Sequence, residues 1–140
     1  MAKVRLLLII FAAFLQLTNF FNFFGVKPNF SLAVLAAIAA TGVVFREYLL
    51  LALLSAVLLK FKPGFDAGAL AFAITAFAIF AANRYLPWNR FLNNFVLIIG
   101  ATFLLQLTIS PVKINFLETA YNLALSAVIL MILPKDNESR

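Results

Sequence analysis

The sequence has 140 residues, of which 65% are hydrophobic and 11% are charged, and its mean hydropathy is +1.06. Soluble domains are roughly a quarter charged, so a water-facing fold of this composition would expose apolar patches that cause aggregation. The composition therefore predicts an all-α, polytopic membrane helical bundle of about six hydrophobic segments.

The net charge of +6 comes from basic residues that stand singly or in pairs between apolar stretches. This placement is typical of membrane topology signals and argues against nucleic acid as a partner. The chain has no cysteine and no histidine, which removes thiol chemistry and the usual nitrogen and sulfur metal ligands. With no phosphate loop and no paired catalytic carboxylates in the sequence, we expect neither a cofactor nor an enzyme.

The first predicted helix runs from about Val4 to Phe24 and follows the basic residues Lys3 and Arg5. A basic start before an apolar run is also typical of a signal peptide. The residues after the run are rich in phenylalanine and asparagine, whereas a cleavage site needs small residues in A-x-A spacing. We therefore expect a retained helix.

A polar stripe lies on this first segment, where Gln16, Asn19 and Asn22 are spaced by three. Amide side chains need hydrogen-bond partners in a membrane, so the stripe is expected to face protein or water. We predict hydrogen bonds to Thr102 and Gln106 of the fifth segment. Binding of a partner helix or of a small polar ligand remains the alternative.

The next two segments are short. Phe30 to Phe45 would span about 24 Å and Tyr48 to Leu59 about 18 Å as helices, against a hydrocarbon core of about 30 Å. Arg46 and Glu47 lie between them, which predicts a turn there at the membrane surface. Since adjacent helical residues point to different sides, this pair need not interact. The sequence thus predicts a short or re-entrant hairpin among four spanning helices.

The fourth segment runs from about Ala67 to Ala82, after a turn at Lys60 to Gly64, and Asp66 is placed to cap it. Alanines four residues apart allow helix backbones to approach closely, and internal packing is the simplest reason for them. These pairs are Ala67 and Ala71, Ala69 and Ala73, and Ala78 and Ala82.

The last two predicted helices run from about Phe91 to Ser110 and from about Phe116 to Leu133, and a proline follows each. The loop before them, 84–90, carries aromatic and basic side chains that suit the headgroup region. Glu118 stands three residues after Asn115, in the spacing of a capping box. A proton or ion role for Glu118 is the alternative, since intramembrane carboxylates are functional candidates.

Orientation follows from the basic residues at the two ends of a six-segment bundle. With the N-terminus inside, seven lie on the cytoplasmic side and four outside. The positive-inside rule therefore predicts that both termini are cytoplasmic. We expect residues 1–134 to form one transmembrane domain, and residues 135–140 to form a charged cytoplasmic tail.

In the order of its features, the chain resembles the rod-shape-determining protein MreD family. The resemblance covers about Val4 to Leu133 and is carried by the Pro28-Asn29 pair, the run 54–59 (LSAVLL) and the run 68–71 (GALA). It implies a noncatalytic subunit of the bacterial inner membrane that assembles with the bitopic protein MreC and with cell-wall synthesis proteins. Such a scaffold would bind partner transmembrane helices.

Two other classes of function remain open. The layout also resembles the substrate-binding S-components of energy-coupling-factor transporters, which bind vitamins or metal ions, although the loops here are very short. The other class is an ion or proton pathway that uses Asp66 or Glu118. The sequence also leaves homo-oligomerisation open.

Overall fold

The computed structural model describes residues 2–18, 21–22, 24–59, 66–109 and 114–133, and this part of the chain is all-helical. The predicted fold class is confirmed to that extent. The expected tail at 135–140 lies outside the described residues. The six helices are α1 (Ala2–Leu17), α2 (Phe30–Ala40), α3 (Phe45–Leu58), α4 (Ala67–Tyr85), α5 (Arg90–Ile109) and α6 (Phe116–Ile132).

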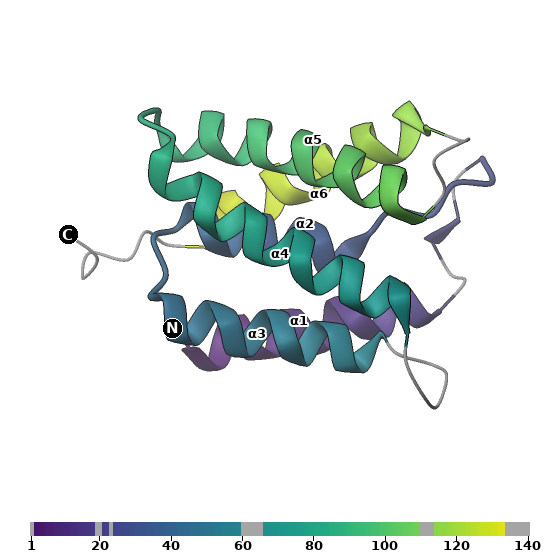
Figure 1. Cartoon of the computed structure of the whole chain (residues 1–140), viewed down its shortest axis with the longest axis horizontal. Helices are drawn as coiled ribbons and strands as arrows, with labels where there is room; N and C mark the ends of the chain where they lie inside the picture. The colour runs from purple at the N-terminus through teal and green to yellow at the C-terminus, as the bar shows by residue number, and fades with distance from the viewer. Residues whose placement is uncertain (1, 19–20, 23, 60–65, 110–113, 134–140) are drawn as a thin grey trace.

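The shortest helix, α2, forms the centre of the bundle (Figure 1). Each of its eleven residues is buried, and it contacts all five other helices. Its sequence, FSLAVLAAIAA, is apolar on every side apart from Ser31, as expected of a helix without a solvent-facing stripe. The small alanine side chains let the surrounding helices pack closely against it.

The other helices surround α2 in the order α1, α3, α4, α5 and α6, with contacts between neighbours along this series. In Figure 1, α1 and α3 lie side by side below, with α5 and α6 above. The backbones of α1 and α6 make no contact, so the ring is open between them. We call this opening the α1–α6 seam.

Successive helices run in alternating directions, which gives the bundle two chemically different ends. One end collects basic residues, and we call it the arginine end; α2 begins among side-chain amides at the other end, and we call it the amide end, although Asn83, Asn89 and Asn93 lie at the arginine end. Among the described residues, the arginine end has Lys3, Arg5, Arg46, Arg84 and Arg90, with Glu47. The amide end has Gln16, Asn22, Asn29, Gln106 and Asn115, with Lys27, Asp66 and Glu118.

The first helix is shorter than the sequence predicts. It ends at Leu17 and does not continue to Phe24. Phe24 and Gly25 have φ values of 53° and 76°, which a right-handed helix cannot contain. The predicted stripe of three helical amides is therefore wrong at Asn22, which lies in the connection after the helix; Asn19 lies outside the described residues.

The turn between the two short segments is also displaced from its predicted position. It occupies residues 41–44, where Gly42 has a φ of 87° that favours glycine. Phe45 begins α3, so Arg46 and Glu47 lie in the first turn of that helix and do not form the break. The Arg46-Glu47 turn prediction is wrong because residues 41–44 already supply a break suited to glycine.

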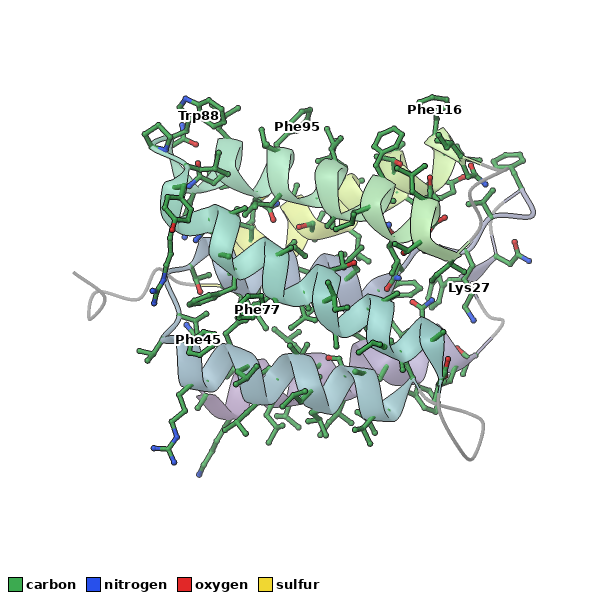
Figure 2. All side chains as sticks on the ribbon, viewed as in Figure 1. Lys27, Phe45, Phe77, Trp88, Phe95 and Phe116 are labelled. Carbon is green, nitrogen blue, oxygen red and sulfur yellow. The ribbon has the colours of Figure 1, made fainter. Side chains whose placement is uncertain are left out.

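Two helices, α4 and α5, are long and apolar enough to cross a membrane, by length and composition. α1 and α6, with 16 and 17 residues, are shorter than the spans predicted for them. Figure 2 shows Phe95 projecting outward from α5, whereas Phe77 lies between α4 and α3 in this view and contacts the ring of Phe45. About half of each of these two side chains is exposed, at 46% for Phe95 and 52% for Phe77.

The contact between α3 and α4 depends on one buried tyrosine. Tyr48 is 1% exposed, and its hydroxyl donates to the backbone oxygen of Ala76 at 2.9 Å. Its ring stacks on Phe80 with the centroids 4.9 Å apart. This pairing satisfies the only polar atom of the tyrosine side chain while the ring packs in the core.

Small side chains line an opening between α4 and α5. Ala78 and Ala82 of α4 border a cavity of about 230 Å³ together with Gly100 and Ala101 of α5. Ala82 and Gly100 are exposed, and a Cβ added at Gly100 would meet nothing within 4 Å. This predicted alanine pair therefore does not mark a closely packed helix contact.

Candidate functional site: the capped central helix and the α1–α6 seam

The start of α2 is held by side chains from three parts of the chain. The backbone N–H of Asn29 donates to Asn122 Oδ1 of α6 at 2.6 Å, and that of Phe30 donates to Gln16 Oε1 of α1 at 2.7 Å. Asn29 itself caps the helix by accepting from Leu32 N at 3.0 Å. A buried helix start leaves unpaired amide groups, and these bonds satisfy three of them, those of Asn29, Phe30 and Leu32.

The end of α2 is held in the same way. Asn83 Nδ2 of α4 donates to the Ala39 oxygen at 2.8 Å, and the Thr41 hydroxyl donates to the Ile38 oxygen at 2.7 Å. The Thr41 hydroxyl also accepts from Arg5 Nη2 at 3.3 Å. The carbonyl groups of Ile38 and Ala39 near the end of this buried helix thus find partners, and a cation lies at its negative end.

An ion pair joins α1 to α3 at the arginine end. Arg5 Nη1 lies 3.0 Å from Glu47 Oε1, and the two side chains are 1% and 31% exposed. Arg5 is therefore more than a topology signal, because its guanidinium connects the starts of α1 and α3 to the end of α2. Arg46 is exposed and does not share this role, although it precedes Glu47 in the sequence.

Polar side chains also join α5 to α6 through the core. Asn122 Nδ2 donates to Thr102 Oγ1 at 3.1 Å, and the Ser126 hydroxyl donates to Asn94 Oδ1 at 2.7 Å. All four side chains are buried. Asn122 thus contacts α5 and α2 at once and lies at the junction of three helices.

Gln106 organises the start of α6. Its Nε2 donates to Glu118 Oε2 at 2.9 Å, and its Oε1 accepts from Asn115 N at 3.1 Å. Asn115 caps α6 through bonds from Leu117 N and Glu118 N. The cap at Asn115 is confirmed, but the partner of its backbone N–H is Gln106, where a capping box would use Glu118.

The predicted polar residues therefore fall into separate places. Gln16 bonds to the start of α2, and the bonds predicted from it to Thr102 and Gln106 are wrong because α1 and α5 are not in contact. Asp66 caps α4 as predicted, accepting from Gly68 N at 2.9 Å. Asn22 is exposed at the amide end.

Several important polar residues were missed at the sequence level, above all Arg5, Asn83 and Asn122. A usable signal existed on the last two helices, where Asn94, Thr102 and Gln106 share one face and Thr119, Asn122 and Ser126 share another. The roles of Arg5 and Asn83 had no such signal, because their partners are far away in the sequence.

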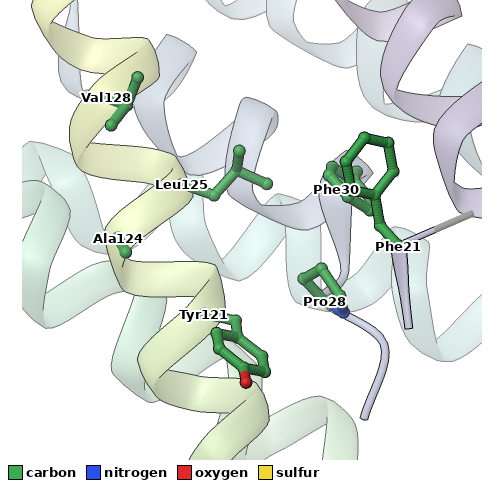
Figure 3. A pocket seen from close by; sticks show the side chains of 7 residues that line it. All are labelled: Phe21, Pro28, Phe30, Tyr121, Ala124, Leu125 and Val128. Atoms are coloured by element: carbon green, nitrogen blue, oxygen red, sulfur yellow. The ribbon is translucent and has the colours of Figure 1, made fainter. Parts of the chain in front are cut away.

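An apolar groove follows the α1–α6 seam at the amide end (Figure 3). Its volume is about 410 Å³, and it opens to the surface. α6 forms one wall, and the connection from α1 together with the start of α2 forms the other. The lining residues are Phe21, Pro28, Phe30, Tyr121, Ala124, Leu125 and Val128.

The capped central helix and the groove in the α1–α6 seam offer hydrogen bonding and side-chain packing. The amides, hydroxyls and ion pair described above connect helices, and the groove offers aromatic and aliphatic walls. Within the described residues, no three histidine, cysteine or carboxylate side chains come together as a metal site. Comparison with protein-family models, with curated proteins and with solved structures gave no match.

Proposed function

We propose that this chain is a noncatalytic integral membrane subunit of a bacterial cell-envelope complex, in which it binds partner transmembrane helices. The observation that carries the proposal is the use of its buried polar side chains. Gln16, Asn83 and Asn122 hold the ends of α2, and Arg5 pairs with Glu47. These groups connect the helices inside the bundle. Its outer surface therefore offers mainly apolar side chains for packing.

A membrane environment is supported by the outward-facing residues. Large apolar side chains are exposed on α1, α3, α4, α5 and α6, which in water would be an aggregation hazard. The two longest helices have the length and hydropathy of spans. A helix as short as α2 suits a membrane protein where it is enclosed by protein, and here side chains of α1, α4 and α6 bond to groups at its two ends.

The orientation proposed from the sequence agrees with the charge distribution. Among the described residues, the arginine end has five basic residues, whereas the amide end has Lys27 with two carboxylates. The positive-inside rule assigns the arginine end to the cytoplasm. The N-terminal helix starts at that end and α6 finishes there, so both termini would be cytoplasmic.

The best candidate surface for a partner helix lies on α1. Val4, Leu7, Phe11 and Phe14 are each at least 50% exposed and follow one another at intervals of three and four residues. That spacing gives a straight apolar seam along a helix. The neighbouring helix α3 widens this surface with Leu50, Leu53 and Val57.

The resemblance to MreD supplies the class of partner: a bitopic, MreC-like protein together with peptidoglycan-synthesis proteins. Binding would come from side-chain packing and interhelical hydrogen bonds, each of the latter contributing about 1 kcal/mol. Many modest contacts would then determine affinity.

Purification in a gentle detergent followed by mass spectrometry tests the proposal. We expect a single-span envelope protein or a cell-wall polymerase to co-purify, and Leu7→Ala with Phe11→Ala to reduce its recovery. The matched control is Leu70→Ala with Phe77→Ala on the exposed face of α4. Recovery of ATPase subunits with a coupling protein, or of a bound vitamin, would overturn the scaffold in favour of an S-component.

A further inference from the structure

We infer that the groove in the α1–α6 seam holds an acyl chain of an anionic phospholipid, whose headgroup contacts Lys27. This site is separate from the α1 surface proposed for a partner helix. The groove is the one place where the ring of helices around α2 lacks a contact between neighbours. Its occupant would complete the lateral packing of the bundle.

The lining of the groove matches a hydrocarbon chain. Phe21, Phe30, Leu125 and Val128 present rings and branched aliphatic groups, and Ala124 leaves space between them (Figure 3). Val128 is 54% exposed and is followed on α6 by the exposed Met131 and Ile132. The groove is therefore continuous with the apolar outer face of α6, from which a lipid chain would enter.

The shape of the groove suits an acyl chain. Tyr121 and Val128 are seven residues apart, so the groove follows α6 for about 10.5 Å. A chain of methylene groups lying along it would make carbon contacts of about 4 Å with its apolar walls.

The position of the groove along α6 lies mostly within one leaflet of a bilayer. Tyr121 lies about 7.5 Å along α6 from its start at Phe116, and Val128 lies about 18 Å along it. One leaflet has a hydrocarbon thickness of about 15 Å, half of the bilayer core. A lipid whose headgroup lies at the amide end would thus place its chain along the groove.

The charge at the mouth of the groove suits an anionic headgroup. Lys27 precedes the lining residue Pro28 and is partly exposed at the amide end (Figure 2). The carboxylate of Glu118 lies one turn before Tyr121, but Gln106 of α5 holds it at 2.9 Å. Asp66 is engaged at the start of α4. Among the described residues, Lys27 is the cation that precedes Pro28 in the chain, and a lipid phosphate would meet it there.

A pair of alanine substitutions on α6 tests the site. Ala124 lines the groove, whereas Ala120, one turn earlier and also exposed, does not. We expect Ala124→Phe to lower the phosphatidylglycerol retained by the purified protein about tenfold, because its ring excludes about two methylene groups from the groove. Native mass spectrometry would measure this retention. Ala120→Phe should retain as much as the parent chain.

Two measurements on folded protein complete the test. In vesicles of phosphatidylglycerol and phosphatidylcholine, a photoactivatable phosphatidylglycerol should cross-link the parent chain at 121–128 and 21–30 in preference to the exposed face of α4. Lys27→Gln should remove the preference for phosphatidylglycerol over phosphatidylcholine. Equal labelling of α4, or unchanged retention in a folded Ala124→Phe variant, would overturn the inference.

A protein occupant would give a different result. If a second copy or a partner helix fills the groove, Val128→Cys labelled with a photoactivatable maleimide should cross-link to that chain on illumination and the lipid probe should be excluded, which would also overturn the inference. The proposed scaffold function is judged separately by co-purification. It can therefore stand if the lipid site fails.

Discussion

Asn122 of α6 accepts a hydrogen bond from the backbone N–H of Asn29 at 2.6 Å, and this contact fixes the start of the central helix. The two residues are 93 positions apart in the sequence. The same asparagine donates to Thr102 of α5, so a single buried amide joins three helices. Its removal should therefore have a larger effect than the loss of one ordinary hydrogen bond.

We predict that Asn122→Leu lowers the free energy of unfolding by about 2 kcal/mol, because the buried N–H of Asn29 and the hydroxyl of Thr102 both lose a partner. Thermal unfolding in detergent, followed by circular dichroism, would measure the change. Asn22→Leu is the control, since Asn22 is exposed. Equal effects of the two substitutions would contradict this role.

The ion pair at the arginine end gives a second prediction. Glu47→Ala removes the carboxylate that lies 3.0 Å from the buried guanidinium of Arg5. We expect a loss of about 2 kcal/mol, less than for a fully buried pair because Glu47 is 31% exposed. Arg46→Ala should change stability by less than about 0.5 kcal/mol, because this neighbouring side chain is exposed.

A double substitution separates the ion pair from simple packing. Arg5→Leu with Glu47→Leu removes both charges and should be more stable than Glu47→Ala alone. Chemical unfolding of these two variants and the parent chain in the same detergent would rank them. If the double variant is no more stable than Glu47→Ala, the loss of the charge pair does not explain the effect of the single substitution.

The hydroxyl of Tyr48 provides a test of the α3–α4 contact. Tyr48→Phe keeps the ring stacked on Phe80 but leaves the oxygen of Ala76 without this donor. The expected cost is about 1 kcal/mol, typical of one buried hydrogen bond. Tyr85→Phe should have no measurable effect on the melting temperature, because Tyr85 is 87% exposed.

Two glycines should respond in opposite ways to the same change. Gly100→Ala should stabilise the protein by about 0.5–1 kcal/mol, because an added Cβ meets nothing within 4 Å and alanine favours the helix. Gly42→Ala should destabilise it by about 1 kcal/mol, because its φ is 87°. Melting temperatures that move in the same direction would refute this contrast.

The proposed topology can be tested with single cysteines, because the natural chain has none. Asn22→Cys at the amide end should react with a membrane-impermeant maleimide in intact spheroplasts. Trp88→Cys at the arginine end should react only after the membrane is opened. The reverse pattern would place the arginine end outside and contradict the positive-inside assignment.

The sequence predicted the helical content well because apolar runs and polar breaks are local features. It also placed Asp66 and Asn115 correctly as caps, since a cap acts on amides only two or three residues away. The first helix was predicted too long because its apolar run continues past Leu17 into residues of positive φ. Hydropathy does not report backbone conformation.

By itself, then, the sequence determined the all-α class, the six helical segments and the shortness of the second and third. Only the tertiary structure showed that α2 is the enclosed centre whereas α3 has an exposed face, because both segments are short and apolar. It also decided that Arg5 pairs with Glu47 and that Asn122 holds Asn29. Those partners depend on how helices distant in the sequence pack, and a buried polar group takes whichever partner that packing brings within reach.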